Sequence, residues 1–165
     1  MKSGSIGSAL LLVVVALVVL RPWEGGGEAE GPGRLTGRVV RAVDGDTLEV
    51  LLGGRHEDVR LIGVDTPETV KPGTPVQCFG PRASAFTHLA ADGRRARLTL
   101  GAERHDVYGR LLAYMRVGPR FLNAALLRRG LARTLTIPPN DRFAPLFRRI
   151  ELGAARAGRG LWGAC

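Results

Sequence analysis

Apolar and polar positions alternate most regularly in the segment just after residue 46, and this alternation predicts the first structural unit. Leucine and valine recur with a period of two over 47–52, as expected for a half-buried strand. The preceding run, 35–43, is also strand-like, and the Asp44-Gly45 pair between the two runs is a strong turn signal. We therefore predict a β-hairpin that turns at Asp44-Gly45.

Further strand-like runs are separated by turn signals. The Gly53-Gly54 pair follows the hairpin, and the next run is rich in branched apolar residues, so the three strands form a meander. Two later runs alternate or are continuously apolar, as strands of a small sheet do. These three additional predicted strands cover 57–64, 95–100 and 111–117.

Three segments have helical signals. Pro81 suits the first position of a helix over 81–91, and a helix over 121–129 ends at Gly130. Apolar residues recur at helical spacing from residue 142 onward, where Pro145 leaves the start of the helix open. Five short strands with a helix inserted after the third, followed by two helices, predict an α+β fold: a five-stranded Greek-key β-barrel of OB type with three helices.

The N-terminus has a targeting signal. The segment from Ile6 to Leu20 is apolar without interruption from Ala9 onward, and as a helix of about fifteen residues it reaches roughly 22 Å, which is short for a bilayer and typical of a signal peptide. No small-x-small cleavage site follows Leu20, so a cleaved signal peptide and an uncleaved anchor both stay open. Either places the domain outside the cytoplasm. The predicted segments are a signal peptide or membrane anchor (1–22), a flexible linker (23–34) and a folded domain (35–165).

The chain is strongly basic, with a formal net charge of +9. Residues 1–30 hold two cations and three anions, so the remainder carries +10. A basic excess favours polyanions such as nucleic acid or an anionic membrane. Nearly all of the cations are arginine, which suits bidentate phosphate contacts, although a coding bias toward arginine explains this equally well.

Two cysteines, Cys78 and Cys165, are too few for a zinc site and do not form a CxxC pair. In an exported chain we expect them to form a disulfide, and two separate buried thiols are the alternative. The bridge would close a loop of nearly ninety residues, for which the chain-entropy relation gives on the order of 4 kcal/mol.

Acidic residues gather at the ends of the predicted strands. Asp46 follows the hairpin turn, and Asp65-Thr66-Pro67 ends the third strand. If these strands pair side by side, Asp46, Asp65 and a backbone carbonyl form an all-oxygen site suited to calcium or magnesium. Arg60 on the same strand then indicates an anionic substrate beside the metal.

The order and spacing of five motifs resemble the staphylococcal nuclease (thermonuclease) family from about residue 35 to residue 162. These motifs are DGDT (44–47), RLIGVDTPE (60–68), GPRASAF (80–86), DVYGR (106–110) and LNAALLRRGLA (122–132). The resemblance implies an OB-type barrel with three helices. It also implies a calcium-dependent phosphodiesterase of DNA and RNA that leaves 3′-phosphorylated products.

The same resemblance assigns roles to individual residues. It implies that Ca²⁺ is bound by Asp46, Asp65 and the backbone carbonyl of Thr66. It implies Glu68 as the general base that activates water. It also implies that Arg60 and Arg110 bind the phosphate and that Tyr108 flanks the nucleotide.

This chain departs from the family pattern at two places. Thr136 and Pro138 stand where the best-known members have a pair of tyrosines, which predicts weaker base stacking. Val107 replaces a residue that is commonly charged. We predict a monomeric endonuclease that is secreted or held by its N-terminus on the outer face of the cytoplasmic membrane. The rival from another class is an OB module that binds nucleic acid without cleaving it.

Overall fold

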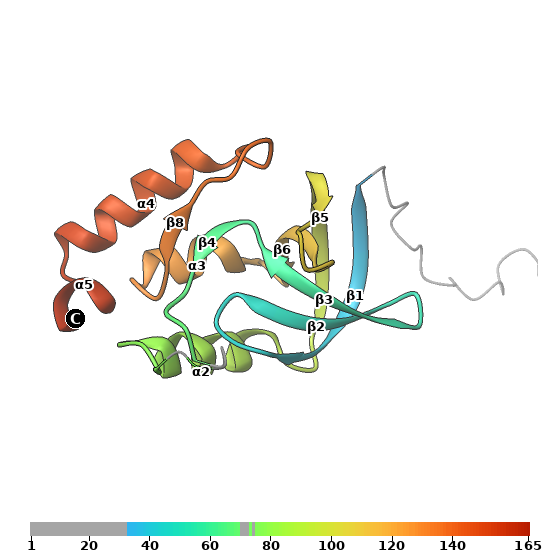
Figure 1. Ribbon diagram of the computed structural model, residues 1–165, viewed down its shortest axis with the longest axis horizontal. Coiled ribbons are helices and arrows are strands. Elements are labelled where there is room, and N and C mark those ends of the chain that lie inside the picture. The colour runs from blue at the N-terminus through green and yellow to red at the C-terminus, as the bar shows by residue number, and fades with distance from the viewer. Residues whose placement is uncertain (1–32, 70–72, 74) are drawn as a thin grey trace, which may run out of the picture.

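The computed structural model describes residues 33–69, 73 and 75–165. Five strands build a barrel in which the β3-β2-β1-β5-β6 order is closed by a parallel β3–β6 pairing, and the short β7 extends the β6 edge. Figure 1 shows these strands on one side of the molecule and α4 and α5 on the other. The strands of this sheet are β1 (Arg34–Ala42), β2 (Thr47–Leu52), β3 (Arg55–Leu61), β5 (Arg95–His105), β6 (Leu111–Val117) and β7 (Arg120–Phe121).

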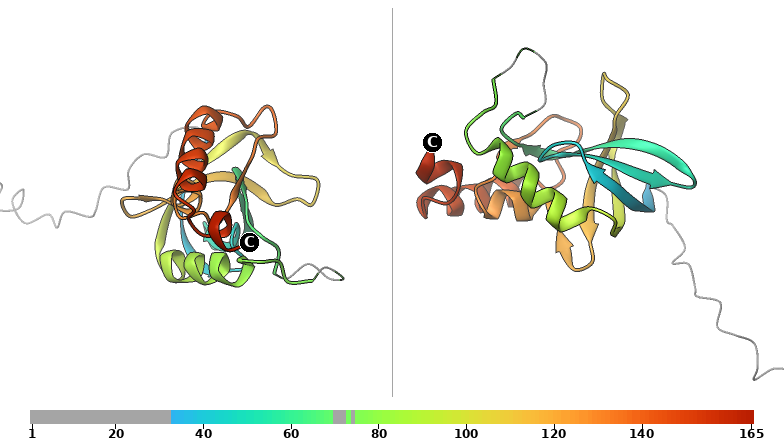
Figure 2. Two further views of the ribbon diagram at one scale, coloured as in Figure 1. Left: turned by 90° about the vertical axis from the view of Figure 1, so that its left-hand side faces the viewer. Right: turned by 90° about the horizontal axis from the view of Figure 1, so that it is seen from below.

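The predicted α+β fold, a five-stranded OB-type barrel with three helices, is confirmed. The alternating residues Leu48 and Val50 of β2 are fully buried in the core, which explains the period of two. Of the three longer helices, α2 packs on β1 and α3 packs on β6 of the barrel, whereas α4 packs on α3 (Figure 2). They are α2 (Gly80–Ala91), α3 (Leu122–Arg128) and α4 (Ala144–Arg156). We did not predict the single-turn helix α5 (Leu161–Ala164) that follows them.

The third strand is not continuous over 57–64 as predicted. It breaks at Ile62, and β4 (Gly63–Asp65) turns away to pair with β8 (Arg133–Leu135) in a second, two-stranded sheet. Gly63 has a φ of 78°, and a Cβ at this position would lie 2.6 Å from the Phe147 ring. The break therefore depends on a glycine that lets α4 pack closely, a contact that a local pattern does not reveal.

Asn123 compensates for the break. Its buried amide nitrogen donates to Ile62 O at 2.8 Å, and its amide oxygen accepts from Met115 N at 3.0 Å. The side chain thus replaces strand-to-strand hydrogen bonds that the turn at Ile62 removes. Arg60 and Asp65 are consequently held on either side of a fixed bend.

Strand β5 is longer than predicted and runs to His105, with a register shift against β6 between Leu100 and His105. Buried Asn140 supports this extension, because its amide accepts from Glu103 N at 3.1 Å and donates to Glu103 O at 2.9 Å. The extended arm supports the 106–110 loop beside the barrel.

A disulfide joins Cys78, just before α2, to Cys165 at the chain terminus. No helix within the described residues combines the length and apolar character needed to cross a bilayer. The predicted signal peptide or anchor (1–22) and most of the predicted linker lie outside the described residues.

Candidate active site

Arg60, at the end of β3, brings together the two aspartates that the sequence places far apart. Its Nη1 forms an ion pair with Asp46 Oδ2, and its Nη2 lies 2.9 Å from Asp65 Oδ1. Nη1 also donates to Val64 O at 3.1 Å. The Arg60 side chain is only 14% exposed, whereas that of Asp65 is 56% exposed. One largely buried guanidinium therefore holds both carboxylates at the rim of the barrel.

The two oxygens of buried Asp46 have different environments. Oδ2 accepts from Thr66 N at 2.7 Å and from Thr66 Oγ1 at 2.9 Å in addition to its ion pair with Arg60. Oδ1 has only a long contact of 3.4 Å from Thr47 Oγ1 within the described part of the chain. Asp46 is thus fixed through Oδ2, and Oδ1 retains acceptor capacity.

The pKa of Asp46 is raised to about 6, chiefly because burial disfavours the charged form. The negative charge of Asp44 contributes to this rise, while the positive charge of Arg60 and the Thr66 hydrogen bonds oppose it. The carboxylate is thus buried with less positive charge than full ionisation favours. An additional cation at this place would stabilise the ionised form.

The hairpin turn that carries Asp46 is itself held from two sides. Thr87 of α2 donates its hydroxyl to Gly45 O at 2.7 Å. A Cβ at Gly45 would lie 2.7 Å from Thr66 Oγ1, so the turn and the segment after β4 approach as closely as glycine allows. The position of Asp46 relative to Thr66 is therefore set by tight packing.

Asp106, four residues earlier in the chain, orients Arg110. Arg110 Nε and Nη2 each lie 2.7 Å from Asp106 Oδ2, and Asp106 Oδ1 accepts from the backbone of Tyr108 and of Arg110. Burial raises the pKa of Asp106, but these hydrogen bonds and the Arg110 charge outweigh burial and hold the pKa below its usual value. Arg110 Nη1 also reaches Thr47 Oγ1 at 3.4 Å, so Arg110 points toward the turn that carries Asp46.

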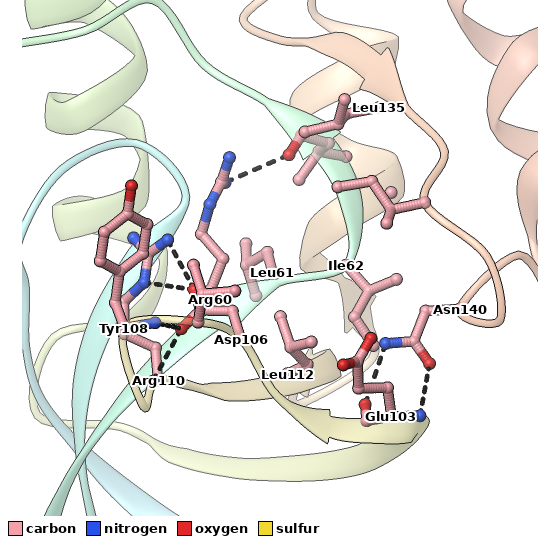
Figure 3. Close-up of a pocket in the computed structure, with 14 residues that line it drawn as sticks. Arg60, Leu61, Ile62, Glu103, Asp106, Tyr108, Arg110, Leu112, Leu135 and Asn140 are labelled. Carbon is pink, nitrogen blue, oxygen red and sulfur yellow. Dashed lines mark hydrogen bonds and ion pairs between the residues drawn. The ribbon is translucent and has the colours of Figure 1, made fainter.

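A cavity of about 300 Å³ opens between the two arginines. Figure 3 shows Arg110 and Tyr108 at one side of it and Leu135 and Asn140 at the other. Tyr108 is 81% exposed, and the Arg110 Cζ lies 5.3 Å from the centre of its ring. Two arginines thus border a largely aliphatic hollow.

The aliphatic wall differs from our expectation. Leu135 and Ile137 line the cavity from the segment that begins with β8, and Thr136 and Pro138, which we matched to the family's pair of tyrosines, do not. Alternation along an extended segment puts residues 135 and 137 on one face, so the period of two was the missed signal. Asp106 is the other residue whose role we missed, and its i,i+4 spacing to Arg110 was the available signal.

Glu68 does not line this cavity. Its carboxylate accepts from Thr69 N at 2.8 Å, and its backbone forms two hydrogen bonds with Gln77. The half-buried Glu68 is thus anchored through its backbone on the loop that leads from Asp65 to α2.

The donor set at the rim fits a hard divalent cation. Across the described residues there is no group of three or more histidine, cysteine, aspartate or glutamate side chains that could hold a metal ion. Asp46, Asp65 and the Thr66 carbonyl provide two carboxylates and a neutral oxygen, a set that leaves coordination positions to water and substrate, as calcium accepts. The metal-ligand and catalytic roles of these residues stay predictions.

Comparison with known proteins identifies the family of this chain. Residues 58–164 match the family model described as staphylococcal nuclease homologue. The chain is 38% identical over 169 residues to a thermonuclease of Staphylococcus intermedius, covering 98% of this chain and 99% of that protein. It is 36% identical to a thermonuclease of Staphylococcus hyicus, covering 95% and 97%. Endonuclease YncB of Bacillus subtilis is 38% identical over 124 residues, which cover 74% of this chain and 59% of that protein. Because nearly the whole chain is covered, it belongs to the staphylococcal nuclease family.

Proposed function

We propose that this protein is a calcium-dependent endonuclease that hydrolyses phosphodiester bonds of DNA and RNA and leaves 3′-phosphorylated products. The observation that carries the proposal is the convergence of two carboxylates and two guanidiniums at one rim, with Arg60 and Arg110 lining the same cavity. Such a set matches the requirements of an anionic ester that must accept further negative charge in its transition state.

Asp46, Asp65 and the Thr66 carbonyl would hold Ca²⁺. Bound calcium supplies positive charge that polarises the phosphoryl oxygen. Arg60 and Arg110 bind the remaining phosphate oxygens and stabilise the charge that develops on them. Asp106 keeps Arg110 in place through its bonds at 2.7 Å, so little reorientation of Arg110 accompanies substrate binding.

Glu68 acts as the general base in this proposal. It takes a proton from water, the hydroxide oxygen bonds to phosphorus, and the bond from phosphorus to the 5′ oxygen breaks. The leaving oxygen takes a proton from solvent, which gives a 5′-hydroxyl and a 3′-phosphate. Tyr108 borders the cavity and packs along the nucleotide, while Leu135 and Ile137 contact the base without aromatic stacking.

We also propose that the enzyme acts outside the cytoplasm as a monomer, either secreted or tethered by its N-terminus. Two features support export: the apolar N-terminal run and the disulfide between Cys78 and Cys165, because disulfides persist in oxidising compartments. The relatives that cover nearly the full chain are thermonucleases.

The direct test is digestion of DNA and RNA by the full-length protein with calcium, with EDTA, and with an Asp46→Ala variant. We expect cleavage only in the first condition, and labelling of the new ends only after phosphatase removes a 3′-phosphate. Cleavage unchanged by EDTA contradicts calcium dependence. A protein that retards DNA in a gel but never shortens it supports the rival, a binding module without catalysis.

A second test separates the arginines of the site from the general basic charge. Lysine keeps the charge but lacks the bidentate fork, so Arg110→Lys should lower kcat by about two orders of magnitude, the loss typical of one oxyanion donor. Arg149→Lys is the matched control, because the Arg149 side chain is exposed on α4 and forms no hydrogen bond or ion pair with any described residue. Equal kcat in both variants would remove Arg110 from the mechanism.

A further inference from the structure

Arg133 occupies a position beside the predicted calcium site that the mechanism above does not use. In the antiparallel β4–β8 pair, Arg133 lies directly opposite Asp65. Side chains at directly opposed positions project from the same face of a sheet, with Cβ atoms about 5 Å apart. A cation is therefore placed next to Asp65, on the same face.

This neighbour does not pair with Asp65. The Asp65 carboxylate is bound to Arg60, whereas the Arg133 Cζ lies 4.3 Å from the ring centre of Trp162. The Arg133 side chain is exposed and has no hydrogen bond or ion pair with any described residue. Unlike Arg60 and Arg110, it is stacked on an aromatic ring, so its charge is not neutralised by an acid.

Trp162 is held firmly enough to serve as a platform. Leu161 N donates to Gly130 O at 2.9 Å, and a Cβ at Gly130 would lie only 3.1 Å from the indole. The indole nitrogen is buried and has no hydrogen-bond partner within the described residues. The disulfide at Cys165 anchors the same short helix. The ring is therefore positioned by packing and by its contact with Arg133.

We propose that Arg133 is a substrate-binding residue that contacts a phosphate flanking the scissile one, and that Trp162 is a positioning residue that keeps Arg133 away from Asp65. The proposal rests on the nuclease function proposed above. Stacking engages the face of a guanidinium and leaves its N–H edge available for a phosphate oxygen. Without the ring, Arg133 would be drawn to the carboxylate directly opposite it and would compete with calcium for Asp65.

The test compares two substrates in the full-length, disulfide-bonded protein: a dinucleotide with one phosphodiester and a single-stranded ten-nucleotide DNA. For Arg133→Gln we expect KM for the longer substrate to rise about tenfold with kcat unchanged, and no change with the dinucleotide. In EDTA, where DNA binds but is not cleaved, the slope of log affinity against log salt should decrease in magnitude by about 0.7, the value for one lost phosphate contact to a single strand.

Arg133→Lys should recover part of this affinity, and Arg149→Gln, which removes an exposed arginine of α4, should leave the KM ratio of the two substrates unchanged. An equal effect of Arg133→Gln on both substrates, or an unchanged salt slope, would overturn the proposal. The binding measurement in EDTA keeps the test separate from the proposed function: if the wild-type protein cleaves nothing, the slope still shows whether Arg133 contacts a phosphate.

The role of Trp162 has its own measurement, calcium binding by isothermal titration. Trp162→Leu should weaken calcium binding, and the double variant with Arg133→Gln should restore it, because the competing cation is gone. Trp162→Phe retains a ring and should bind calcium like the wild type. A double variant no better than Trp162→Leu, or Trp162→Phe as weak as Trp162→Leu, would refute the positioning role.

Discussion

Removal of the disulfide should destabilise the protein mainly by raising the conformational entropy of the unfolded chain. The bridge between Cys78 and Cys165 spans 87 positions of sequence, and the chain-entropy relation gives about 4.5 kcal/mol at 25 °C for a loop of this length. Both cysteines are exposed, so replacing them with serine leaves no buried cavity. The predicted loss is a large share of the roughly 5 to 15 kcal/mol that holds a typical domain together.

The assay is urea unfolding of the full-length protein and of the Cys78→Ser/Cys165→Ser variant without calcium. We expect the midpoint to fall, with a loss of about 3 to 4.5 kcal/mol, the lower end allowing for residual structure in the unfolded chain. The wild-type protein treated with a reductant is the matched control and should give the same loss. The slope m should rise slightly, because the unbridged chain exposes more surface.

A loss below about 1 kcal/mol would refute this reasoning. The four-residue α5 is held to the domain by few backbone hydrogen bonds outside itself, such as Leu161 N to Gly130 O. If α5 detached before the domain unfolds, the bridge would protect only this local opening, and the global free energy of unfolding would hardly change. Hydrogen exchange of the α5 amides distinguishes the two outcomes.

Two further predictions concern residues that set the geometry of the rim. Gly63→Ala forces a side chain into a positive φ against the Phe147 ring and should cost roughly 2 to 4 kcal/mol in urea unfolding. Gly153→Ala is its control: a Cβ there meets nothing within 4 Å in α4, so it should stabilise by about 0.5 to 1 kcal/mol. Because the pKa of Asp106 is lowered in the fold, its contribution is present at neutral pH and is lost as pH falls through that lowered pKa. Asp106→Asn should therefore lower the Tm at pH 7 by more than at pH 3, and an equal loss of Tm at both pH values would contradict this. The same substitution should reduce kcat, because Arg110 loses its ion-pair partner.

Local sequence patterns predicted most of the barrel because its strands follow local rules. The period of two in β2 and the turn at Asp44 need no distant contact to be recognised, and the short turn sets the pairing beside it, Ala42 with Leu48. The register shift between Val39 and Arg41 does not follow from the turn. The candidate site was predictable for a related reason: Arg60 and Asp65 lie five residues apart on either side of one bend.

The features of the fold that were missed depend on contacts between distant residues. The break after β3 requires Phe147, which lies in the last long helix. The extension of β5 requires the Asn140 amide, 37 positions beyond Glu103. Helix α5 is too short to be stable alone and exists because it packs against Gly130. In each case the local residues permit several conformations, and packing selects one.

The hairpin turn shows how such distant contacts give two aspartates, Asp44 and Asp46, different roles. Asp44 Oδ1 accepts from Asp46 N at 2.9 Å and from Thr47 N at 2.8 Å, so the first aspartate stabilises the turn itself. Asp46, two positions later, is bound by Thr66, which is 20 residues away in sequence. Both aspartates are equally suited to a turn, and only the approach of Thr66 makes one a structural residue and the other a candidate ligand. Asp44→Asn should therefore have little effect on the free energy of unfolding, because an amide oxygen can still accept both backbone bonds, whereas Asp46→Asn should remove a charge that only the site requires.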